Sequence, residues 1–165
     1  MTTFSRKCDL VVIRVFDAPL KQVWKAWSEP ELAMRWSGPT GFTSPVAKMD
    51  FREGGTSLAY MRAPKALGGQ DFYNTWSYEK IVPMKRFAYI LHFADQDSKV
   101  MDPVKQGLPL EMPKEVRHEV AFNDLSNGKT EVTVTEYGWT VGQLMEMSKM
   151  GLEQCLDKLA AVFAE

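Results

Sequence analysis

The stretch VRHEVAFNDLSNGKTEVTVTEY, residues 116–137, contains two runs in which apolar and polar side chains alternate. Alternation with a period of two is typical of β-strands with one buried face, and it predicts strands over about 115–124 and 129–137. The residues between the two runs, Ser-Asn-Gly at 126–128, are common in tight turns. The stretch therefore predicts an antiparallel hairpin.

The length of the connecting loop determines which side chains face each other across this hairpin. A two-residue turn at 127–128 would place Phe122 opposite Thr133, and would set apolar residues against polar ones along the ladder. A three-residue loop at 126–128, with its glycine in the left-handed position, places Phe122 opposite Val132 instead. We expect the second register, because it gives the hairpin one continuous apolar face.

This register also places His118 opposite Glu136, with both side chains on the buried side of the sheet. A carboxylate beside an imidazole could orient the ring and stabilise its protonated form, as a general base requires. Alternatively, the two side chains could satisfy each other at the end of a pocket without doing any chemistry. The sequence leaves both interpretations open.

The strand pattern extends over most of the chain that precedes the hairpin. Turn signals, such as the Glu-Gly-Gly at 53–55, separate most of the runs. Together with the hairpin, these runs predict a largely antiparallel sheet of about seven strands. The additional strands are expected at 10–16, 43–52, 56–62, 71–82 and 86–94.

Two short helices are predicted directly after the first strand. Asp17 is a candidate capping residue and Pro19 a first-turn proline, and apolar residues then recur at helical spacing as far as Trp27. The second helix begins near Pro30 and ends at Gly38.

A long helix is predicted at the end of the chain, from Thr140 to about Phe163, because Thr140 and Gln143 have the spacing of a capping box. Its apolar stripe includes two small residues, Ser148 and Gly151. A glycine inside a helix costs about 1 kcal/mol relative to alanine. Its presence here indicates either close packing on the sheet or room for a ligand.

Residues 96–115 interrupt the strand pattern. This segment contains three prolines and a glycine, which argue against regular structure, and it is too long for a hairpin turn. We interpret it as a mobile lid or flap within a single domain that spans 1–165.

Composition excludes several classes of function. Twenty basic and twenty-one acidic side chains leave a formal net charge of −1, so no broad positive field favours nucleic acid or anionic membranes as partners. No apolar run approaches the roughly 20 residues that cross a bilayer. Cys8 and Cys155 lie far apart without metal-ligand spacing, so we expect free thiols in a cytoplasmic protein with no metal site and no cofactor.

Five segments carry a resemblance to one known family. They are DAPLKQVWKAWSEPELAMRWSGP (17–39), MDFREGG (49–55), YEKIVPMKRF (78–87), GKTEVTVTEYGW (128–139) and GLEQCLDKLA (151–160). Together they resemble the activator-homologue family named for a co-chaperone of the ninety-kilodalton heat-shock protein, within the START-like or SRPBCC superfamily. The resemblance covers nearly the whole chain. One departure is Trp76, which stands where the family commonly has glycine and could crowd a cavity.

The resemblance implies an α+β helix-grip fold, in which a curved antiparallel sheet wraps around the last helix. It also implies a hydrophobic pocket that takes lipids, polyketides or other apolar molecules in various members, but not one particular reaction. Some START-like proteins are cyclases or hydro-lyases, which keeps an enzymatic role for His118 and Glu136 open. The co-chaperone's separate N-terminal domain has no counterpart in the expected single domain. An interaction module that docks a chaperone, or a homodimer contact, is the third alternative.

Strand parity and the helix stripe together predict which residues line such a pocket. Aromatic residues share one face of 71–82 and of 86–94, and methionines suit a permissive pocket because their side chains adapt to irregular shapes. Ordinary core packing is the alternative for each of them. The predicted lining residues are Trp36, Trp76, Tyr78, Phe87, Tyr89, Phe93, Leu110, Met112, His118, Val120, Phe122, Val134, Met145, Ser148 and Leu152.

Overall fold

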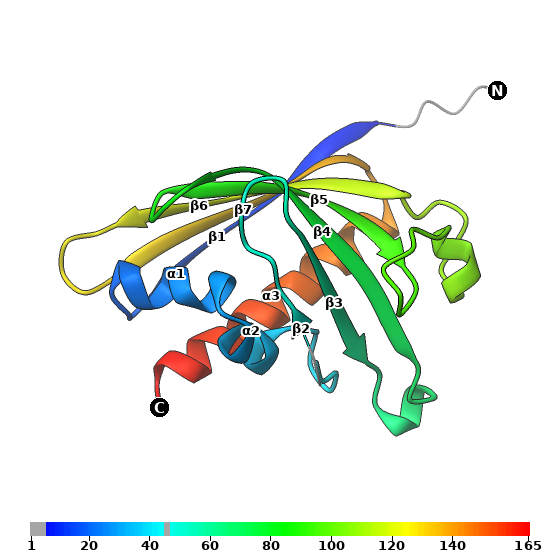
Figure 1. Ribbon diagram of the computed structural model, residues 1–165, viewed down its shortest axis with the longest axis horizontal. Coiled ribbons are helices and arrows are strands. Elements are labelled where there is room, and N and C mark those ends of the chain that lie inside the picture. Colours follow the sequence, from blue (N-terminus) through cyan, green and yellow to red (C-terminus); the bar gives the residue numbers. More distant parts are fainter. Residues whose placement is uncertain (1–5, 45–46) are drawn as a thin grey trace.

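One curved sheet wraps around a long C-terminal helix in the computed structural model, which describes residues 6–44 and 47–165 (Figure 1). Two short 3-10 turns, η1 (Lys65–Leu67) and η2 (Pro103–Gln106), lie in the connections. The helices and strands are β1 (Lys7–Phe16), α1 (Leu20–Ser28), α2 (Pro30–Trp36), β2 (Ala47–Lys48), β3 (Thr56–Arg62), β4 (Asp71–Val82), β5 (Arg86–Ala94), β6 (Glu115–Asp124), β7 (Thr130–Thr140) and α3 (Gln143–Phe163).

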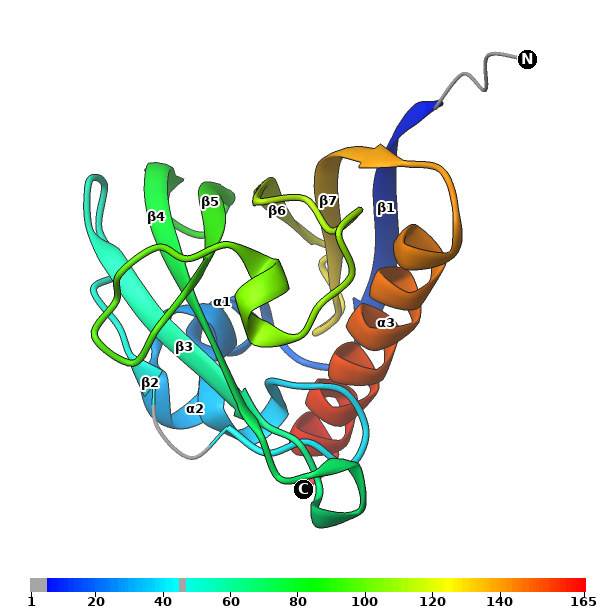
Figure 2. The same cartoon turned by 90° about the vertical axis from the view of Figure 1, so that its right-hand side faces the viewer.

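The sheet is a seven-stranded antiparallel meander in the order β1-β7-β6-β5-β4-β3-β2. Consecutive strands from β2 to β7 are neighbours, and β1 joins the sheet beside β7, at the opposite edge from β2. Figure 2 shows the sheet curving around α3, with α1 and α2 at one end of the concave face. The α+β helix-grip fold expected from the resemblance is therefore confirmed.

The predicted register of the last hairpin is also confirmed. Phe122 lies opposite Val132 and His118 lies opposite Glu136. The loop has left-handed backbone at Ser126, with φ +68°, as well as at Gly128, with φ +78°. A continuous apolar face was the correct criterion for choosing between the two loop lengths, because one face of this sheet is buried.

The strand predicted at 43–52 is present but much shorter than predicted. Among the described residues of this stretch, only β2 and an isolated bridge between Thr43 and Arg62 pair as strand; residues 45–46 lie outside the described part. The chain instead turns tightly before β3, where a Cβ on Gly55 would lie 2.4 Å from the carbonyl oxygen of Asp50. Local alternation predicted a strand here, but this close approach requires a turn.

Both predicted helix caps are wrong. Helix α1 starts at Leu20, after Pro19, with no side-chain cap hydrogen bond from Asp17 or any other residue described there. Strand β7 extends to Thr140, and α3 begins only at Gln143 after Gly142. Pairing with β1 holds Thr140 in the sheet, opposite Lys7, and this contact outweighs the local capping signal.

The core is densely aromatic at the end of the sheet that α1 and α2 cover. The Trp24 ring makes edge contacts with Phe51, Phe87 and Phe122, at centroid distances of 5.6, 5.9 and 5.0 Å. Trp27 packs against Trp36 at 4.8 Å. Such ring pairs add to the stabilisation that burial of apolar area already provides. This end of the concave face is therefore closed by side chains.

The loop that follows α2 is bound to α3 by a lysine. Lys158 Nζ donates to the backbone oxygens of Ser37, Gly38 and Phe42 at 3.1, 3.0 and 3.2 Å. Gly151 faces the same loop, since a Cβ there would lie 4.0 Å from Pro39. The mid-helix glycine thus lies against this loop and shows no tight packing on the sheet.

Replacing Lys158 with methionine is expected to lower the free energy of unfolding by about 2 kcal/mol, because it removes the donor to the loop while keeping the apolar stem. Urea denaturation measures the loss. The matched control, Lys149→Met, changes an exposed lysine of the same helix, and its effect should stay within about 0.5 kcal/mol. Equal effects of the two variants would contradict the role of Lys158.

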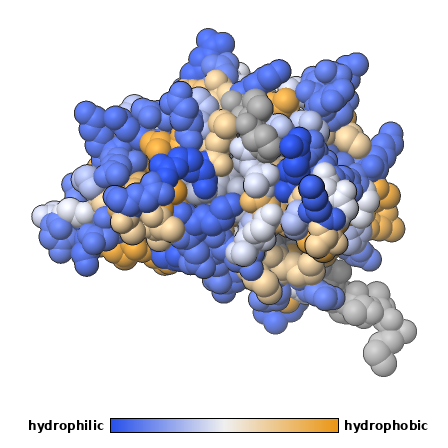
Figure 3. All heavy atoms as spheres, turned by 90° about the horizontal axis from the view of Figure 1, so that it is seen from below, coloured by the Kyte–Doolittle hydropathy of each residue, from blue (hydrophilic) through white to orange (hydrophobic). Residues whose placement is uncertain are grey.

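The face that carries the helices is mostly hydrophilic, with hydrophobic residues in separate patches (Figure 3). No helix in the described ranges is both long and apolar enough to cross a membrane.

Candidate functional site

A row of buried side chains crosses the middle of the sheet. Tyr78 lies opposite Tyr89, Tyr89 opposite His118, His118 opposite Glu136, and Glu136 opposite Leu10. Each of these residues is less than a tenth exposed. The strand order therefore brings an imidazole, a carboxylate and two phenols into one row on the concave face, beneath α3.

His118 and Glu136 form the charged part of this row. His118 Nε2 lies 3.6 Å from Glu136 Oε2, and the two side chains are 9% and 7% exposed. His118 Nδ1 lies 3.1 Å from the carbonyl oxygen of Val116. Because a carbonyl can only accept, Nδ1 carries the hydrogen and Nε2 faces the carboxylate. A proton on Nε2 would make the ring a cation paired with Glu136.

Two further donors hold the Glu136 carboxylate. Trp139 Nε1 donates to Oε1 at 3.1 Å, and Ser148 Oγ of α3 donates to the same oxygen at 3.3 Å. Glu136 and Trp139 both face inward although they are three residues apart, because the register shifts between them and Gly138 has a φ of +77°. A glycine inside a strand pattern is a typical sign of such a bulge. Trp139 was missing from the predicted site, and Gly138 was the available signal.

Aromatic rings stack along the row beside the ion pair. The centroid of the Tyr89 ring lies 4.3 Å from that of Trp76 and 4.6 Å from that of His118, with interplanar angles of 11° in both cases. The Trp76 indole donates to Asn74 Oδ1 at 2.6 Å. Trp76 therefore occupies part of the concave face.

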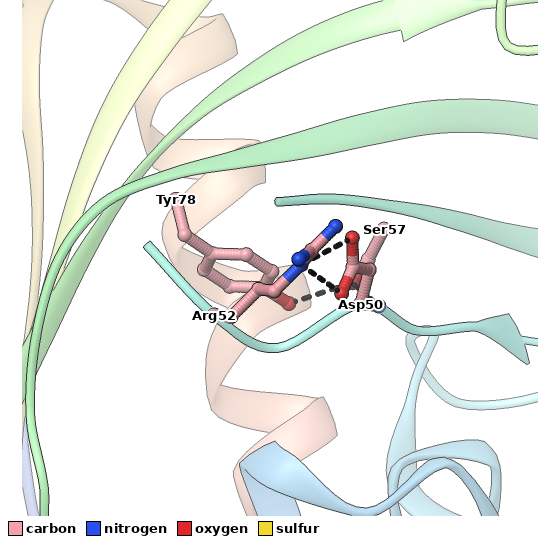
Figure 4. Close-up of polar contacts among 4 residues, drawn as sticks. All are labelled: Asp50, Arg52, Ser57 and Tyr78. Carbon is pink, nitrogen blue, oxygen red and sulfur yellow. Dashed lines mark hydrogen bonds and ion pairs between the residues drawn. The ribbon is translucent and has the colours of Figure 1, made fainter. Parts of the chain in front are cut away.

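The phenol of Tyr78 is held by Ser57 of β3, which is in turn linked to the turn before that strand (Figure 4). Its Oη lies 2.9 Å from Ser57 Oγ, which accepts from the backbone N–H of Asp50 at 3.1 Å. Arg52 then pairs with the Asp50 carboxylate at 2.9 Å. Burial raises the pKa of Tyr78 to about 12, although the Ser57 hydrogen bond lowers it. Burial likewise raises the pKa of Tyr89 well above its ordinary value.

The raised pKa of Tyr78 predicts a loss of stability at alkaline pH. The neutral phenol is favoured in the folded state, so its contribution is complete below about pH 10, the ordinary value, and is lost as pH rises through about 12. A pKa raised from 10 to about 12 corresponds to roughly 2 to 3 kcal/mol of unfolding free energy. Tyr78→Phe should show a correspondingly smaller fall in urea stability across this window. If Tyr78→Phe loses as much stability as the wild type over this pH range, the loss does not come from the Tyr78 phenol.

Burial decreases along the concave face toward the end that lies away from α1. On β5, Phe87 and Tyr89 are 1% and 4% exposed, whereas Leu91 and Phe93 are half-buried. On β4, Tyr78 is buried, but Trp76, Asn74 and Phe72 are half-buried. The concave face is thus fully buried beside α1 and partly exposed at the other end, which is called the open end below.

The segment 96–115 is attached to the sheet near this open end. Gln106 Nε2 donates to the carbonyl oxygens of Tyr73 and Ala94, at 3.1 and 2.7 Å. The backbone N–H of Met101 donates to Phe93 O at 2.9 Å. The segment also contains η2, so the expectation that it lacks regular structure is wrong, since proline is compatible with the start of a 3-10 turn.

Most of the predicted lining residues come together in the core that includes the seam between the sheet and α3. Val120, Phe122 and Val134 are buried in it, and Met112, Met145 and Leu152 pack against it while partly buried. Phe93 is half-buried and is not among the residues packed against this core. Two other predicted residues do not line the seam. Trp36 belongs to the closed end, where its indole donates to Ala26 O at 2.9 Å. Leu110 is 84% exposed and lines no part of the seam, because the flap turns it toward solvent.

Depressions also occur on the outer surface. One of about 180 Å³ lies between Lys48, Tyr60 and Gln96, and another beside Glu146 and Glu153 on the solvent side of α3. Neither is lined by a residue of the buried row. Within 6–44 and 47–165, no three His, Cys, Asp or Glu side chains are grouped as metal ligands.

Comparisons with known proteins agree with this fold. The family described as "Activator of Hsp90 ATPase homolog 1-like protein" matches residues 17–164. A search of curated proteins gives no match to this chain.

Several solved structures share the fold. A Chromobacterium violaceum protein has a TM-score of 0.76 and 24% identity, over 95% of this chain and 97% of its own. An Arthrobacter aurescens protein has a TM-score of 0.75 and 22% identity, over 94% and 86%. The AHSA1 protein from Silicibacter pomeroyi has a TM-score of 0.72 and 18% identity, over 95% and 98%. At these identities, the likeness concerns the fold alone.

Proposed function

The chain belongs to the family of activator of Hsp90 ATPase homolog 1-like proteins, and from this premise we propose that it binds an apolar or aromatic small molecule between the concave face of the sheet and α3. Binding of hydrophobic ligands is known in this family. The observation that carries the proposal is the decrease in burial from Phe87 and Tyr89 to Leu91 and Phe93 along one face of β5. Half-buried apolar side chains beside a buried polar row are typical of a binding site, because a bound ligand would cover the apolar surface that is still exposed.

The side chains at the open end are suited to making room for a ligand. Met112 of the flap and Met145 of α3 are partly buried against the core, and unbranched thioether chains change rotamer readily. The ligand would replace contacts that these methionines and Leu152 make with the core. Its apolar part would lie on the rings, and the polar row would contact any polar part.

A matched pair of substitutions in α3 tests this site. Met145→Trp fills the seam and is expected to weaken binding about tenfold or more, since a packed site tolerates added volume poorly. Met147→Trp adds the same volume on the outer side of the helix, where Met147 is 57% exposed, and should leave binding unchanged.

Binding is followed by native mass spectrometry and by thermal shift with 2-acetylnaphthalene and a panel of lipophilic compounds. The proposal requires that at least one compound raises the Tm of the wild type. It fails if no compound does, or if Met145→Trp and Met147→Trp bind equally well.

An enzymatic function is the second candidate, because His118 and Glu136 are adjacent and buried. In a cyclase or hydro-lyase, His118 would act as general base and Glu136 would orient it. Product formation from bound compounds, followed by mass spectrometry, should then disappear in His118→Ala while binding stays measurable. If binding and turnover fall together, His118 serves only as part of the wall.

A further inference from the structure

The hydroxyl of Tyr89 is the polar group in the buried row whose hydrogen-bonding capacity is unused. Tyr89 is 4% exposed, and its Oη makes no hydrogen bond to any residue in the described part of the chain. The fully enclosed side-chain atom without a partner in that part is Gln106 Oε1, so the Tyr89 hydroxyl retains some accessible surface. By contrast, Tyr78 Oη pairs with Ser57, and both nitrogens of His118 face acceptors. A hydroxyl that no neighbouring residue satisfies and that keeps a small accessible surface is free to bond to a water or to a polar atom of a ligand.

The surroundings of Tyr89 place it centrally in the seam. Its ring is stacked between Trp76 and His118, so it is held firmly between neighbouring strands. The ionisable groups that influence it are Glu136 of β7, Tyr78 of β4 and Cys155 of α3. The phenol is thus surrounded by elements from both sides of the seam, between the sheet and the helix.

We propose that Tyr89 donates a hydrogen bond to an uncharged oxygen of the bound molecule, such as the carbonyl of a ketone, ester or amide. This inference rests on the proposed function and specifies its ligand class. The phenol remains protonated at neutral pH, because burial raises its pKa, and is therefore a donor.

The charges around the seam favour a neutral ligand over an anionic one. Glu136 is the carboxylate of the row, and His118, when protonated, only balances it. Lys158 lies near Cys155 on α3, but its ammonium group is already shared among backbone oxygens, including those of Ser37 and Gly38. The seam therefore offers no excess positive charge to a fatty-acid or other carboxylate.

Two probes of nearly equal shape isolate the hydrogen bond. In 2-acetylnaphthalene a ketone oxygen stands where 2-isopropenylnaphthalene has a methylene group, and 2-naphthoate supplies the anionic comparison. The wild type should bind the ketone about threefold to tenfold more tightly than the alkene, which is the usual net effect of one hydrogen bond. It should bind 2-naphthoate more weakly than the ketone.

Tyr89→Phe keeps the stacked ring and removes only the hydroxyl, so it should abolish the preference for the ketone while binding of the alkene persists. The matched control is Tyr73→Phe, at a position opposite Ala94 and outside the buried row, which should keep the preference. Infrared spectroscopy of the bound ketone adds a measurement on the wild type alone: its carbonyl stretch should move to lower frequency than in an apolar solvent.

The outcomes separate this inference from the proposed function. Equal binding of ketone and alkene by the wild type, or an unshifted carbonyl stretch, overturns the role of Tyr89 while ligand binding stands. Tighter binding of 2-naphthoate than of the ketone overturns the assignment to neutral oxygens. If neither neutral probe nor any compound of the lipophilic panel binds, the proposed function itself fails.

Discussion

Replacing Glu136 with leucine is expected to lower the free energy of unfolding by about 3 to 5 kcal/mol, as measured by urea denaturation. The carboxylate is 7% exposed and serves His118, Trp139 and Ser148 at once. Its removal leaves the Trp139 indole N–H and the Ser148 hydroxyl without their acceptor, and His118 without the carboxylate that faces Nε2. The cost thus comes mainly from the unpaired partners, which leucine cannot satisfy.

Two further variants distinguish this explanation from a general effect of the substitution. Glu131→Leu makes the same change on the same strand, at a residue that is only half-buried, and should alter stability by no more than about 0.5 kcal/mol. The double variant His118→Phe/Glu136→Leu should recover much of the loss, because it removes the ion pair as a whole. A double variant that is less stable than Glu136→Leu alone would contradict the account.

Replacing Gly55 with alanine is expected to cost about 3 kcal/mol of unfolding free energy. The new Cβ would lie 2.4 Å from the carbonyl oxygen of Asp50 and 2.9 Å from Arg52 Cγ. The first of these atoms belongs to the backbone and cannot rotate away, so the turn before β3 must shift. The shift would also disturb the paired backbone hydrogen bonds of Gly54 and Gly55 with Tyr78.

The neighbouring glycine provides the control for this prediction. Gly54 has a φ of +78°, but a Cβ there would meet nothing within 4 Å. Gly54→Ala should therefore lower the free energy of unfolding by only about 1 to 2 kcal/mol, which is the cost of placing alanine in the left-handed conformation. Both variants can be compared by urea denaturation and by near-ultraviolet circular dichroism. If Gly55→Ala proves no more destabilising than Gly54→Ala, the steric explanation is wrong.

The alternation of apolar and polar residues was sufficient to predict the strands of the sheet wherever one face is buried along its whole length. The hairpin of β6 and β7 shows this, because only one register sets Phe122 against Val132, and the same register brings His118 to Glu136. The pattern predicted too long a strand at 43–52, where the course of the chain depends on the close approach of Gly55 to Asp50. Such a contact leaves no periodic trace in the sequence.

The candidate site could be predicted in part for the same reason. Strand parity found Tyr78, Tyr89 and His118, since neighbouring strands align their inward side chains. It missed Trp139, because the bulge at Gly138 breaks the alternation that parity assumes. Parity also says nothing about Trp36 or Leu110, whose positions depend on how a short helix and a flap pack.

The sequence alone indicated the helix-grip fold, through the resemblance that it carries. It also predicted the facing pair His118 and Glu136, because alternating burial restricts the register of a sheet. Tertiary structure decided which polar groups are satisfied. Trp139 and Ser148 reach Glu136 only through a bulge and the placement of α3, whereas Gln106 Oε1 is enclosed without a partner among the described residues. Hydrogen bonding depends on distances between elements far apart in the chain, and no local pattern records those distances.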